Sequence, residues 1–410
     1  MSRDDRRRVS RRRFLAETAA AAAAFSIVPR SVLGGEGNVS PSETFGAALV
    51  GCGGRGGGTF GGLGPNVRRL ASCDVKFLDR VDNKETYSDF RRVMERKDID
   101  LVAIATPPHW HALITIAAME AGKDVLCEKP MTRFIAEGRA VVEAEKRYNR
   151  IFQVGTFGRF RDSRNPDHIL THKIMTSGLL KKCPGVHIKR AGLKVRQWSG
   201  IVNAKPQPVP ANLDWDMYCG PSPLRPYHPH RTGGTHRGYW DYEGGGMADM
   251  GQHHFDPVQW IWAKDDTSAV EIEPHAPPAH PECCAMWGWV ELKYADGLTF
   301  VLDSGEWGEP YDRKEERGIS LSDLSEEDQK KVLAMPDPEP LVPFPTAIRT
   351  RQKAGGHAES SHRAAAIMHL ANIAIRVGRK IRFDPVTDQV IGDDEANRLV
   401  NPPMRAPWHL

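Results

Sequence analysis

The sequence predicts an α/β protein in which a doubly wound parallel sheet is followed by a second α/β domain. Short apolar runs alternate with helical segments from residue 45 onward, and a glycine cluster directly follows the first run. With 410 residues, the chain is also too long for one ordinary hydrophobic core. We therefore expect domains at residues 44–160 and 161–410, preceded by a signal and linker at residues 1–43.

The N-terminal segment has the order of features found in an export signal. Arg11 and Arg12 precede Phe14 and Leu15, and an apolar run follows at 19–28. This order is typical of a twin-arginine (Tat) signal, which exports folded proteins. The run is well short of the ~20 residues that span a bilayer, although an uncleaved N-terminal anchor or an alanine-rich arm without a targeting role remains open. We expect an exported, periplasmic or extracytoplasmic protein that meets the Tat translocase during export.

Charge and cysteine content exclude several other classes. The formal net charge is +4, but residues 1–30 hold eight arginines against three carboxylates, so the remainder is close to neutral and gives no nucleic-acid footprint. The seven cysteines are odd in number, and several end apolar runs, which favours buried thiols over a disulfide framework. No cysteine and histidine have zinc spacing, so we expect no metal site.

The glycine cluster indicates a dinucleotide-binding Rossmann domain. Gly51, Gly53 and Gly56 match G-x-G-x-x-G after an apolar strand, and Asp74 lies 18 residues further along, at the end of a second strand. Glycines let the backbone approach a pyrophosphate, and a carboxylate at this distance can accept hydrogen bonds from the adenosine ribose. Because its charge would repel a 2′-phosphate, Asp74 predicts NAD, with NADP less likely.

Polar side chains follow two further predicted strands, at 101–106 and 124–127. The carboxyl ends of parallel strands meet at one edge of a sheet, where ligands bind in doubly wound folds. The sequence therefore places six further candidate cofactor-binding residues beside the glycines: Thr106, Pro107, His109, His111, Glu128 and Lys129.

A helical segment after Gly246 carries a second candidate site. Asp249 and His253 are four residues apart and share one helix face, whereas His254 points roughly 100° away. This pair suits proton transfer. A structural Asp–His pair, a satisfied core histidine and a metal pair remain alternatives. Upstream, residues 235–245 combine Arg237 with several aromatic residues, which suits a sugar or polyol but equally suits packing between domains.

The ordered motifs resemble the Gfo/Idh/MocA oxidoreductases over residues 45–410. The resemblance is carried by GCGGRG, ATPPHWHA, CEKPM, FQVGT, GGGMADMGQHHFD, HLANIAIRVGRKIRFDP and NPPMRAPW. It implies that the second domain has a large open, mainly antiparallel sheet, often used to form dimers or tetramers. It also implies that the last ~25 residues pack back on the Rossmann domain.

The resemblance further implies roles for individual residues. Lys129 would be the catalytic lysine, Glu128 and Thr106 would lie near the nicotinamide ribose, and the Lys129–Pro130 peptide would be cis. His253 would be the general acid/base, and Asp249 would orient the substrate or the imidazole.

We therefore expect an exported NAD-dependent oxidoreductase that acts on a CH–OH group of a sugar or polyol. Because partner dehydrogenases are not evident outside the cytoplasm, we expect a tightly bound cofactor that is recycled internally. Two alternatives remain: a redox-neutral glycosidase or lyase that works through a transient keto-sugar, and a non-catalytic NAD-binding sensor.

Overall fold

The first sheet is parallel and six-stranded, in the order β3-β2-β1-β4-β5-β6. Its strands are β1 (Phe45–Val50), β2 (Val67–Cys73), β3 (Thr86–Tyr87), β4 (Leu101–Ile104), β5 (Asp124–Cys127) and β6 (Phe152–Val154). The chain order reverses between β1 and β4, which is the switch point where ligands bind in this architecture. The predicted doubly wound parallel sheet is confirmed.

This computed structural model describes the chain in several ranges. The ranges are residues 44–76, 85–180, 183, 187–191, 193, 199–311 and 318–410. Residues 46–410 belong to one compact unit. The predicted export signal lies outside the described residues.

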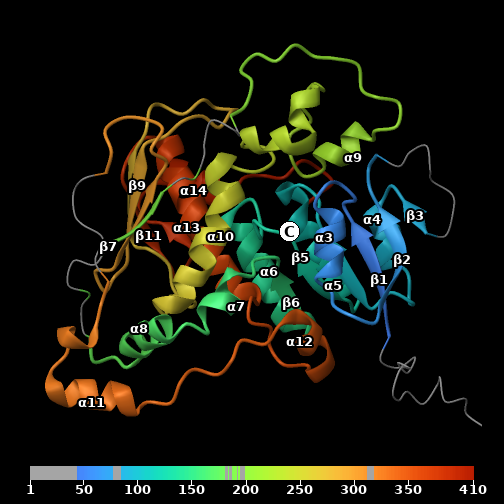
Figure 1. Cartoon of the computed structure of the whole chain (residues 1–410). Helices are drawn as coiled ribbons and strands as arrows, with labels where there is room; N and C mark the ends of the chain where they lie inside the picture. Colours follow the sequence, from blue (N-terminus) through green and yellow to red (C-terminus); the bar gives the residue numbers. More distant parts are fainter. Residues whose placement is uncertain are drawn as a thin grey trace, which may run out of the picture. The chain divides into compact units, whose positions relative to one another are not determined.

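Short helices connect the strands of the first sheet (Figure 1). They are α3 (Gly56–Gly61), α4 (Phe90–Met94), the 3₁₀ turn η2 (Pro108–Trp110), α5 (His111–Glu120) and α6 (Ile135–Tyr148). The Asp89 side chain caps α4 by accepting a hydrogen bond from the Arg91 backbone N–H. A buried face makes α6 amphipathic, with Val141 and Val142 turned inward.

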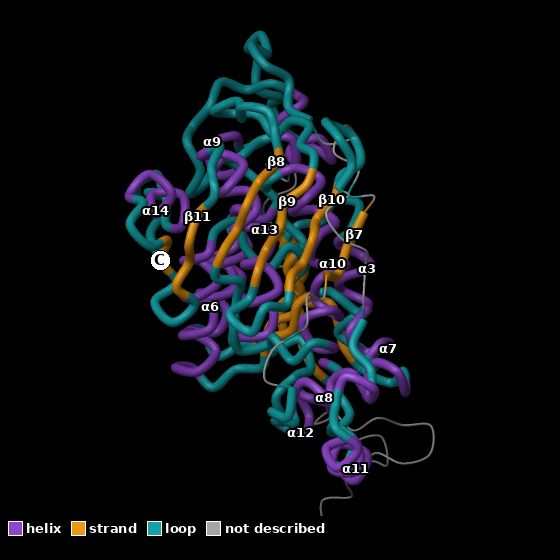
Figure 2. Tube along the Cα trace, turned by 90° about the vertical axis from the view of Figure 1, so that its left-hand side faces the viewer, coloured by secondary structure: helices purple, strands orange, loops and turns teal. Residues whose placement is uncertain are grey.

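The second sheet also has six strands, in the order β12-β11-β8-β9-β10-β7. Its strands are β7 (His187–Ala191), β8 (Glu271–His275), β9 (Trp289–Lys293), β10 (Thr299–Asp303), β11 (Ile381–Asp384) and β12 (Gln389–Val390). Only β7 and β10 pair in parallel, so the sheet is mainly antiparallel, as the resemblance implies. Among the described residues, no helix covers the face of this sheet that is turned to the viewer in Figure 2.

Helices and turns of the second half lie between and around the two sheets. They are α7 (Gly158–Asp162), α8 (Pro166–Thr176), α9 (Trp215–Cys219), η4 (Pro229–Arg231), η5 (Gly233–Gly238), α10 (Gly245–Ile261), η6 (Leu321–Asp323), α11 (Glu326–Ala334), α12 (Phe344–Thr350), α13 (Ala358–Val377) and α14 (Asp394–Val400). Gly378 ends α13 with a φ of +66°, a conformation that glycine adopts without steric cost.

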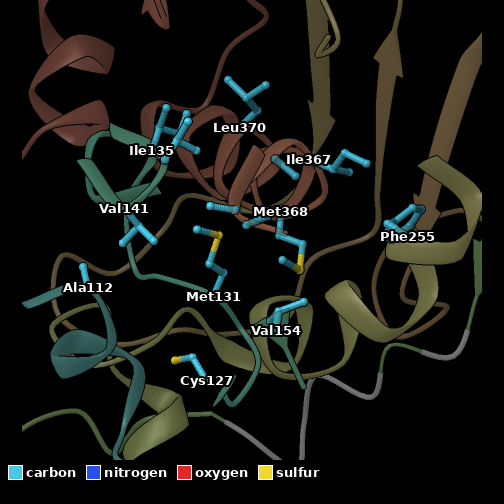
Figure 3. Packing of buried hydrophobic residues seen from close by; sticks show 14 of the residues in the cluster. Ala112, Cys127, Met131, Ile135, Val141, Val154, Phe255, Ile367, Met368 and Leu370 are labelled. Carbon is cyan, nitrogen blue, oxygen red and sulfur yellow. The ribbon is translucent and has the colours of Figure 1, made fainter. Parts of the chain in front are cut away.

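A single hydrophobic core joins the two sheets through α13. This helix packs against α6 on one side and against α10 on the other. Figure 3 shows Ile135 and Val141 of α6 facing Met368 and Leu370 of α13 across this core. The two domains therefore share buried apolar surface and do not meet only at a polar cleft.

All seven cysteines are free thiols, and six of them are buried, which agrees with the expectation of buried thiols. Within the described part of the chain, no helix is both long enough and apolar enough to cross a membrane.

Candidate active site

The glycine-rich loop between β1 and α3 folds tightly at two positions and stays open at two others. Gly51 has a φ of +89°, and a Cβ there would lie 2.4 Å from the Thr106 backbone nitrogen. A Cβ at Gly56 would lie 2.6 Å from the Gly51 carbonyl oxygen. At Gly53 and Gly54, a Cβ would meet nothing within 4 Å. The loop is thus packed against the sheet and exposes open backbone on its other side, which suits the close approach of a pyrophosphate.

Asp74 is fixed beside this loop at the end of β2. Its Oδ2 accepts a hydrogen bond of 2.8 Å from the Cys52 backbone N–H, and its Oδ1 accepts one of 3.0 Å from the Lys76 backbone N–H. The sequence predicts the residue but not these bonds. They orient the carboxylate next to the open loop, where a ribose would lie.

A cavity of about 760 Å³ runs along this edge of the sheet. Its size lies within the range of small-molecule and cofactor sites. Predicted site residues from both domains line it: Gly51, Gly53, Asp74, Thr106, Pro107, Glu128, Lys129, Asp249 and His253. The Thr106 hydroxyl is buried and has no hydrogen-bond partner among the described residues, so it is available to a bound group. The loop, the cavity and this hydroxyl all fit a dinucleotide.

His109 and His111 lie behind the cavity wall and do not line it. Both rings are buried. His109 Nε2 is 2.7 Å from the Tyr218 carbonyl oxygen. His111 places one ring nitrogen 2.8 Å from the Pro130 carbonyl oxygen and the other 2.8 Å from the Thr106 carbonyl oxygen. The two histidines therefore hold the cavity wall in place. Gly56, also outside the lining, packs α3 against the loop.

Glu128 accepts hydrogen bonds both from the segment of the glycine-rich loop and from Lys129. Its Oε1 accepts hydrogen bonds from the Thr59 hydroxyl at 2.8 Å and from Arg55 Nε at 3.1 Å, and its Oε2 accepts one from the Lys129 backbone N–H at 3.2 Å. Arg55 lies inside the G-x-G-x-x-G motif and is not among the residues that the sequence predicts for the site. Its position in that motif was the available signal for a cation near a pyrophosphate.

Lys129 forms the centre of the second group of residues. Its Nζ donates to Asp249 Oδ1 at 2.7 Å and to the Asp249 carbonyl oxygen at 2.6 Å. The Lys129–Pro130 peptide is cis, as the resemblance implies. The lysine side chain is 10% exposed and the aspartate side chain 8%, so the ion pair is shielded from bulk water.

Helix α10 supplies both Asp249 and His253 from one face, and both line the cavity. The helix is held by Gln252, whose amide accepts from the Met131 backbone N–H at 2.7 Å and donates to the Ser361 carbonyl at 3.1 Å. Among the described residues, no hydrogen bond joins Asp249 to the His253 ring. Asp249 instead contacts Lys129 and Arg237, so it orients the lysine.

The pKa values of Asp249 and His253, the two titratable residues of α10 that line the cavity, are both lowered. Burial, followed by the positive charge of Lys129, lowers the pKa of His253 from 6.5 to about 4. Burial alone would raise the pKa of Asp249, but the charges of Lys129 and Arg237 outweigh it and hold that pKa below its usual value. At pH 7, His253 is therefore a neutral base beside an ionised carboxylate.

A chain of polar contacts extends away from Lys129. Arg237 Nε donates to Asp249 Oδ1 at 2.8 Å and lies 3.6 Å from Glu243 Oε2. The same carboxylate oxygen is 3.2 Å from His236 Nε2. Glu243 and His236 line the cavity, yet no local pattern singles them out in the sequence. The aromatic residues of the same segment, Tyr239, Trp240 and Tyr242, are buried and do not line the cavity.

Across the described ranges, no group of three or more His, Cys, Asp or Glu side chains is arranged to hold a metal ion.

Curated relatives match only part of this chain. Levoglucosan dehydrogenase of Pseudarthrobacter phenanthrenivorans is 37% identical over 125 residues, 30% of each chain. Inositol 2-dehydrogenase 4 of Saccharopolyspora erythraea is 35% identical over 122 residues, which cover 28% of this chain and 35% of the relative. The matched regions thus span about a third of these relatives.

Solved structures resemble the fold over most of the chain. The WlbA dehydrogenase of Bordetella pertussis, in complex with NADH and UDP-GlcNAcA, has a TM-score of 0.53 at 15% identity, and the match covers 83% of this chain and 99% of that one. An oxidoreductase domain protein from Kribbella flavida has a TM-score of 0.50 at 18% identity, covering 85% and 100%.

Two family models match consecutive parts of the sequence. Residues 69–156 match the NAD-binding Rossmann fold of an oxidoreductase family, and residues 168–410 match the C-terminal alpha/beta domain of the same family. Together they include Lys129, Asp249 and His253. The protein therefore belongs to the Gfo/Idh/MocA oxidoreductase family, and its first domain is that family's NAD-binding domain.

Proposed function

We propose that this protein is an NAD-dependent oxidoreductase that acts on a hydroxyl group of a sugar or polyol. The observation that carries the proposal is the shielded Lys129–Asp249 pair, which lines the same cavity as the glycine-rich loop and a neutral His253. The names of the relatives support the substrate class, since levoglucosan and inositol are both polyhydroxylated.

In the proposed reaction, one C–H and one O–H bond of the substrate break and a carbonyl forms. Bound NAD supplies the acceptor for the hydride from that carbon. His253 accepts the hydroxyl proton because its ring is neutral at pH 7. The Lys129 Nζ stabilises the negative charge that develops on the oxygen and can relay the proton. Asp249 and Arg237 hold the lysine in place.

The test is a reduction assay on purified protein. Levoglucosan, myo-inositol, D-xylose and a wider panel of monosaccharides, polyols and glycosides are added with NAD, and NADH absorbance is followed. We expect at least one compound to give NADH and an equimolar carbonyl product. As a control, Lys331→Ala on the exposed side of α11 should behave as the wild type. NAD binding without reduction by any compound, even in a single turnover, would favour the sensor. A new product without net NADH would favour the redox-neutral cycle.

We also propose that the protein is exported through the Tat system with its cofactor already bound. The order of Arg11, Arg12 and the apolar run supports export, and the free buried thiols are compatible with folding in a reducing compartment. A cofactor carried across a membrane must stay bound and be restored within the enzyme, either by a second substrate or by a transient keto-intermediate.

Export and retention can be measured together. Full-length protein from the periplasmic fraction should contain close to one nicotinamide per chain without added NAD. Arg11→Lys with Arg12→Lys should leave the protein in the cytoplasm. If the wild type and the double lysine variant divide equally between cytoplasm and periplasm, export through the Tat system is wrong. If the periplasmic protein contains no nicotinamide, retention of the cofactor is wrong.

A further inference from the structure

A very short helix lines the Asp74 end of the cavity. Met217 and Tyr218 of α9 line the cavity together with Asp74 and Phe90. The helix spans only Trp215–Cys219. Helices of this length are not stable by themselves in water. The position of this cavity wall therefore depends on what holds α9 from outside.

The Rossmann domain holds α9 from one side. The Asp214 backbone N–H, at the start of the helix, donates to the Val75 carbonyl oxygen at 2.9 Å. The Trp110 indole N–H donates to the Met217 carbonyl oxygen at 3.0 Å. These contacts attach α9 to the end of β2 and to the start of α5.

The C-terminal tail, residues 401–410, holds α9 from the other side. Arg405 donates from Nη1 to Asp216 Oδ1 at 2.7 Å, from Nη2 to the Asp216 carbonyl at 2.8 Å, and from Nε to the Gly220 carbonyl at 2.9 Å. Its backbone N–H donates to the Pro221 carbonyl at 2.9 Å. The planar guanidinium thus bonds the Gly220 carbonyl after the helix and adds a second hydrogen bond to the Asp216 carbonyl, which already accepts from the Gly220 backbone N–H.

Trp408 connects the same tail to the Rossmann wall. Its ring lies 4.8 Å from the Trp110 ring, edge to face, and 6.3 Å from the Phe90 ring. The Arg91 guanidinium lies 5.3 Å from the Trp408 ring centre. Because Trp110 and Phe90 themselves line the cavity, the tail braces this wall from behind.

We propose that residues 401–410 act as a latch that keeps α9 closed over the Asp74 end of the cavity and slows cofactor exchange. Arg405 and Trp408 are positioning residues in this device. The inference rests on the proposed function, because it requires that NAD binds in this cavity. It also follows from the shared core in Figure 3, since opening the cavity by separating the domains would expose buried apolar surface. Helix α9 instead packs in a separate, smaller cluster that includes Trp215 and Tyr218, so it can be displaced without opening the core that the two sheets share.

The experiment measures how fast the full-length protein releases NADH. Protein loaded with NADH is mixed with excess NAD, and the loss of bound-NADH fluorescence is followed in a stopped-flow instrument. Arg405→Ala and Trp408→Ala should each release NADH at least ~10-fold faster, because interface changes act mainly on dissociation rates. Turnover at saturating NAD should stay within about twofold of wild type, since neither residue lines the catalytic end.

Matched variants separate a latch from a general structural role. Arg379→Ala removes another C-terminal arginine, which pairs with Asp393 and Glu395, and should leave release unchanged. Arg405→Lys and Trp408→Phe should recover part of the slow release. Asp216→Asn alters only a carboxylate that is 70% exposed and should accelerate release slightly, which keeps the test open if Arg405→Ala fails to fold.

The outcomes distinguish this inference from the proposed function. If wild type binds NADH and both alanine variants release it at the wild-type rate while folded, the latch is wrong and the function stands. If the wild type binds no NADH, the latch and the proposed function are both wrong. If wild type is purified without NAD but the variants still release added NADH faster, retention fails and the latch is supported.

Discussion

The two ends of the cavity are built in different ways. The Lys129 end is carried by α10, a helix of 17 residues that is buried along most of its length. The Asp74 end is lined by α9, a helix of five residues, which contacts the chain terminus. The candidate reacting groups are therefore fixed by a long buried helix, whereas our proposal makes access for the cofactor depend on a short helix and the chain terminus.

Buried charges strengthen the catalytic end further. Arg159 of α7 is 1% exposed and contacts both Asp256 of α10 and Asp265 after it, at 3.0 Å and 2.7 Å. The Thr156 hydroxyl donates to the same Asp256 at 2.7 Å. These contacts fix the half of α10 that follows His253, so the helix cannot shift without exposing or unpairing charged groups.

The largest effects should come from removing the reacting groups. Lys129→Ala and His253→Ala should each lower turnover by ~10²-fold or more, because each loses a proton-transfer or charge-stabilising group. NADH release should stay at the wild-type rate, which is the opposite of the pattern expected for Arg405→Ala. Steady-state kinetics and stopped-flow release measure the two quantities. Near-normal turnover in either variant would remove that residue from the mechanism.

A large loss of stability should follow from unpairing the anchor of α10. Arg159→Ala leaves the fully buried Asp256 carboxylate without its cation and should lower the free energy of unfolding by about 3–5 kcal/mol. Urea denaturation measures this. Arg161→Ala, a change at an exposed arginine of the same helix, is the control and should leave the denaturation midpoint unchanged. Equal midpoints for both variants would mean that the catalytic end is not anchored as described.

The pH dependence should report His253, which Lys129, Glu128, Asp249 and Arg55 surround. With its pKa near 4, the ring stays neutral from pH 7 to well below the usual 6.5, so kcat/KM should lose its basic group only as pH falls towards about 4. Because the unfolded chain takes up this proton near 6.5 and the folded protein only near 4, stability should fall as pH is lowered through that window. An acid limb of kcat/KM near pH 6.5 would contradict the burial of this ring.

The smallest effect should be on cofactor choice at the Asp74 end. Asp74→Asn can keep the acceptor for the Cys52 N–H but removes the charge, so the preference for NAD over NADP should fall by ~10-fold. Titrating cofactor-free protein with both dinucleotides measures it, with Asp98→Asn as an exposed control. Tighter binding of NADP by the wild type would overturn the assignment of Asp74.

Much of the fold was predictable because it follows from local patterns. The first apolar strand and the glycine cluster that follows it are encoded within about a dozen residues, and the structure has this strand as β1 with a tight turn at Gly51. The position of Asp249 and His253 on the same helix face followed from their spacing of four residues. Their shared position with Lys129 came from the resemblance, since 120 residues separate Lys129 from Asp249.

The rest was not predictable because the contacts join distant segments. Arg405 reaches Asp216 across 189 positions, and no local pattern marks either residue. The surroundings of His109 and His111 were not predictable for the same reason. Their place after a strand predicts a cofactor contact, whereas in the structure their buried rings contact the carbonyl oxygens of Tyr218 and Pro130, which lie in other segments.

The shared core also limits how this protein can be recombined. Met368 of α13 contacts the core that Ile135 of the Rossmann domain helps to form, so each domain presents an apolar surface shaped by the other. A chimaera that pairs this Rossmann domain with the C-terminal domain of a relative would inherit mismatched cavities and overlaps at that surface. A chimaera that keeps this packing would have to take α6 and α13 from the same parent protein.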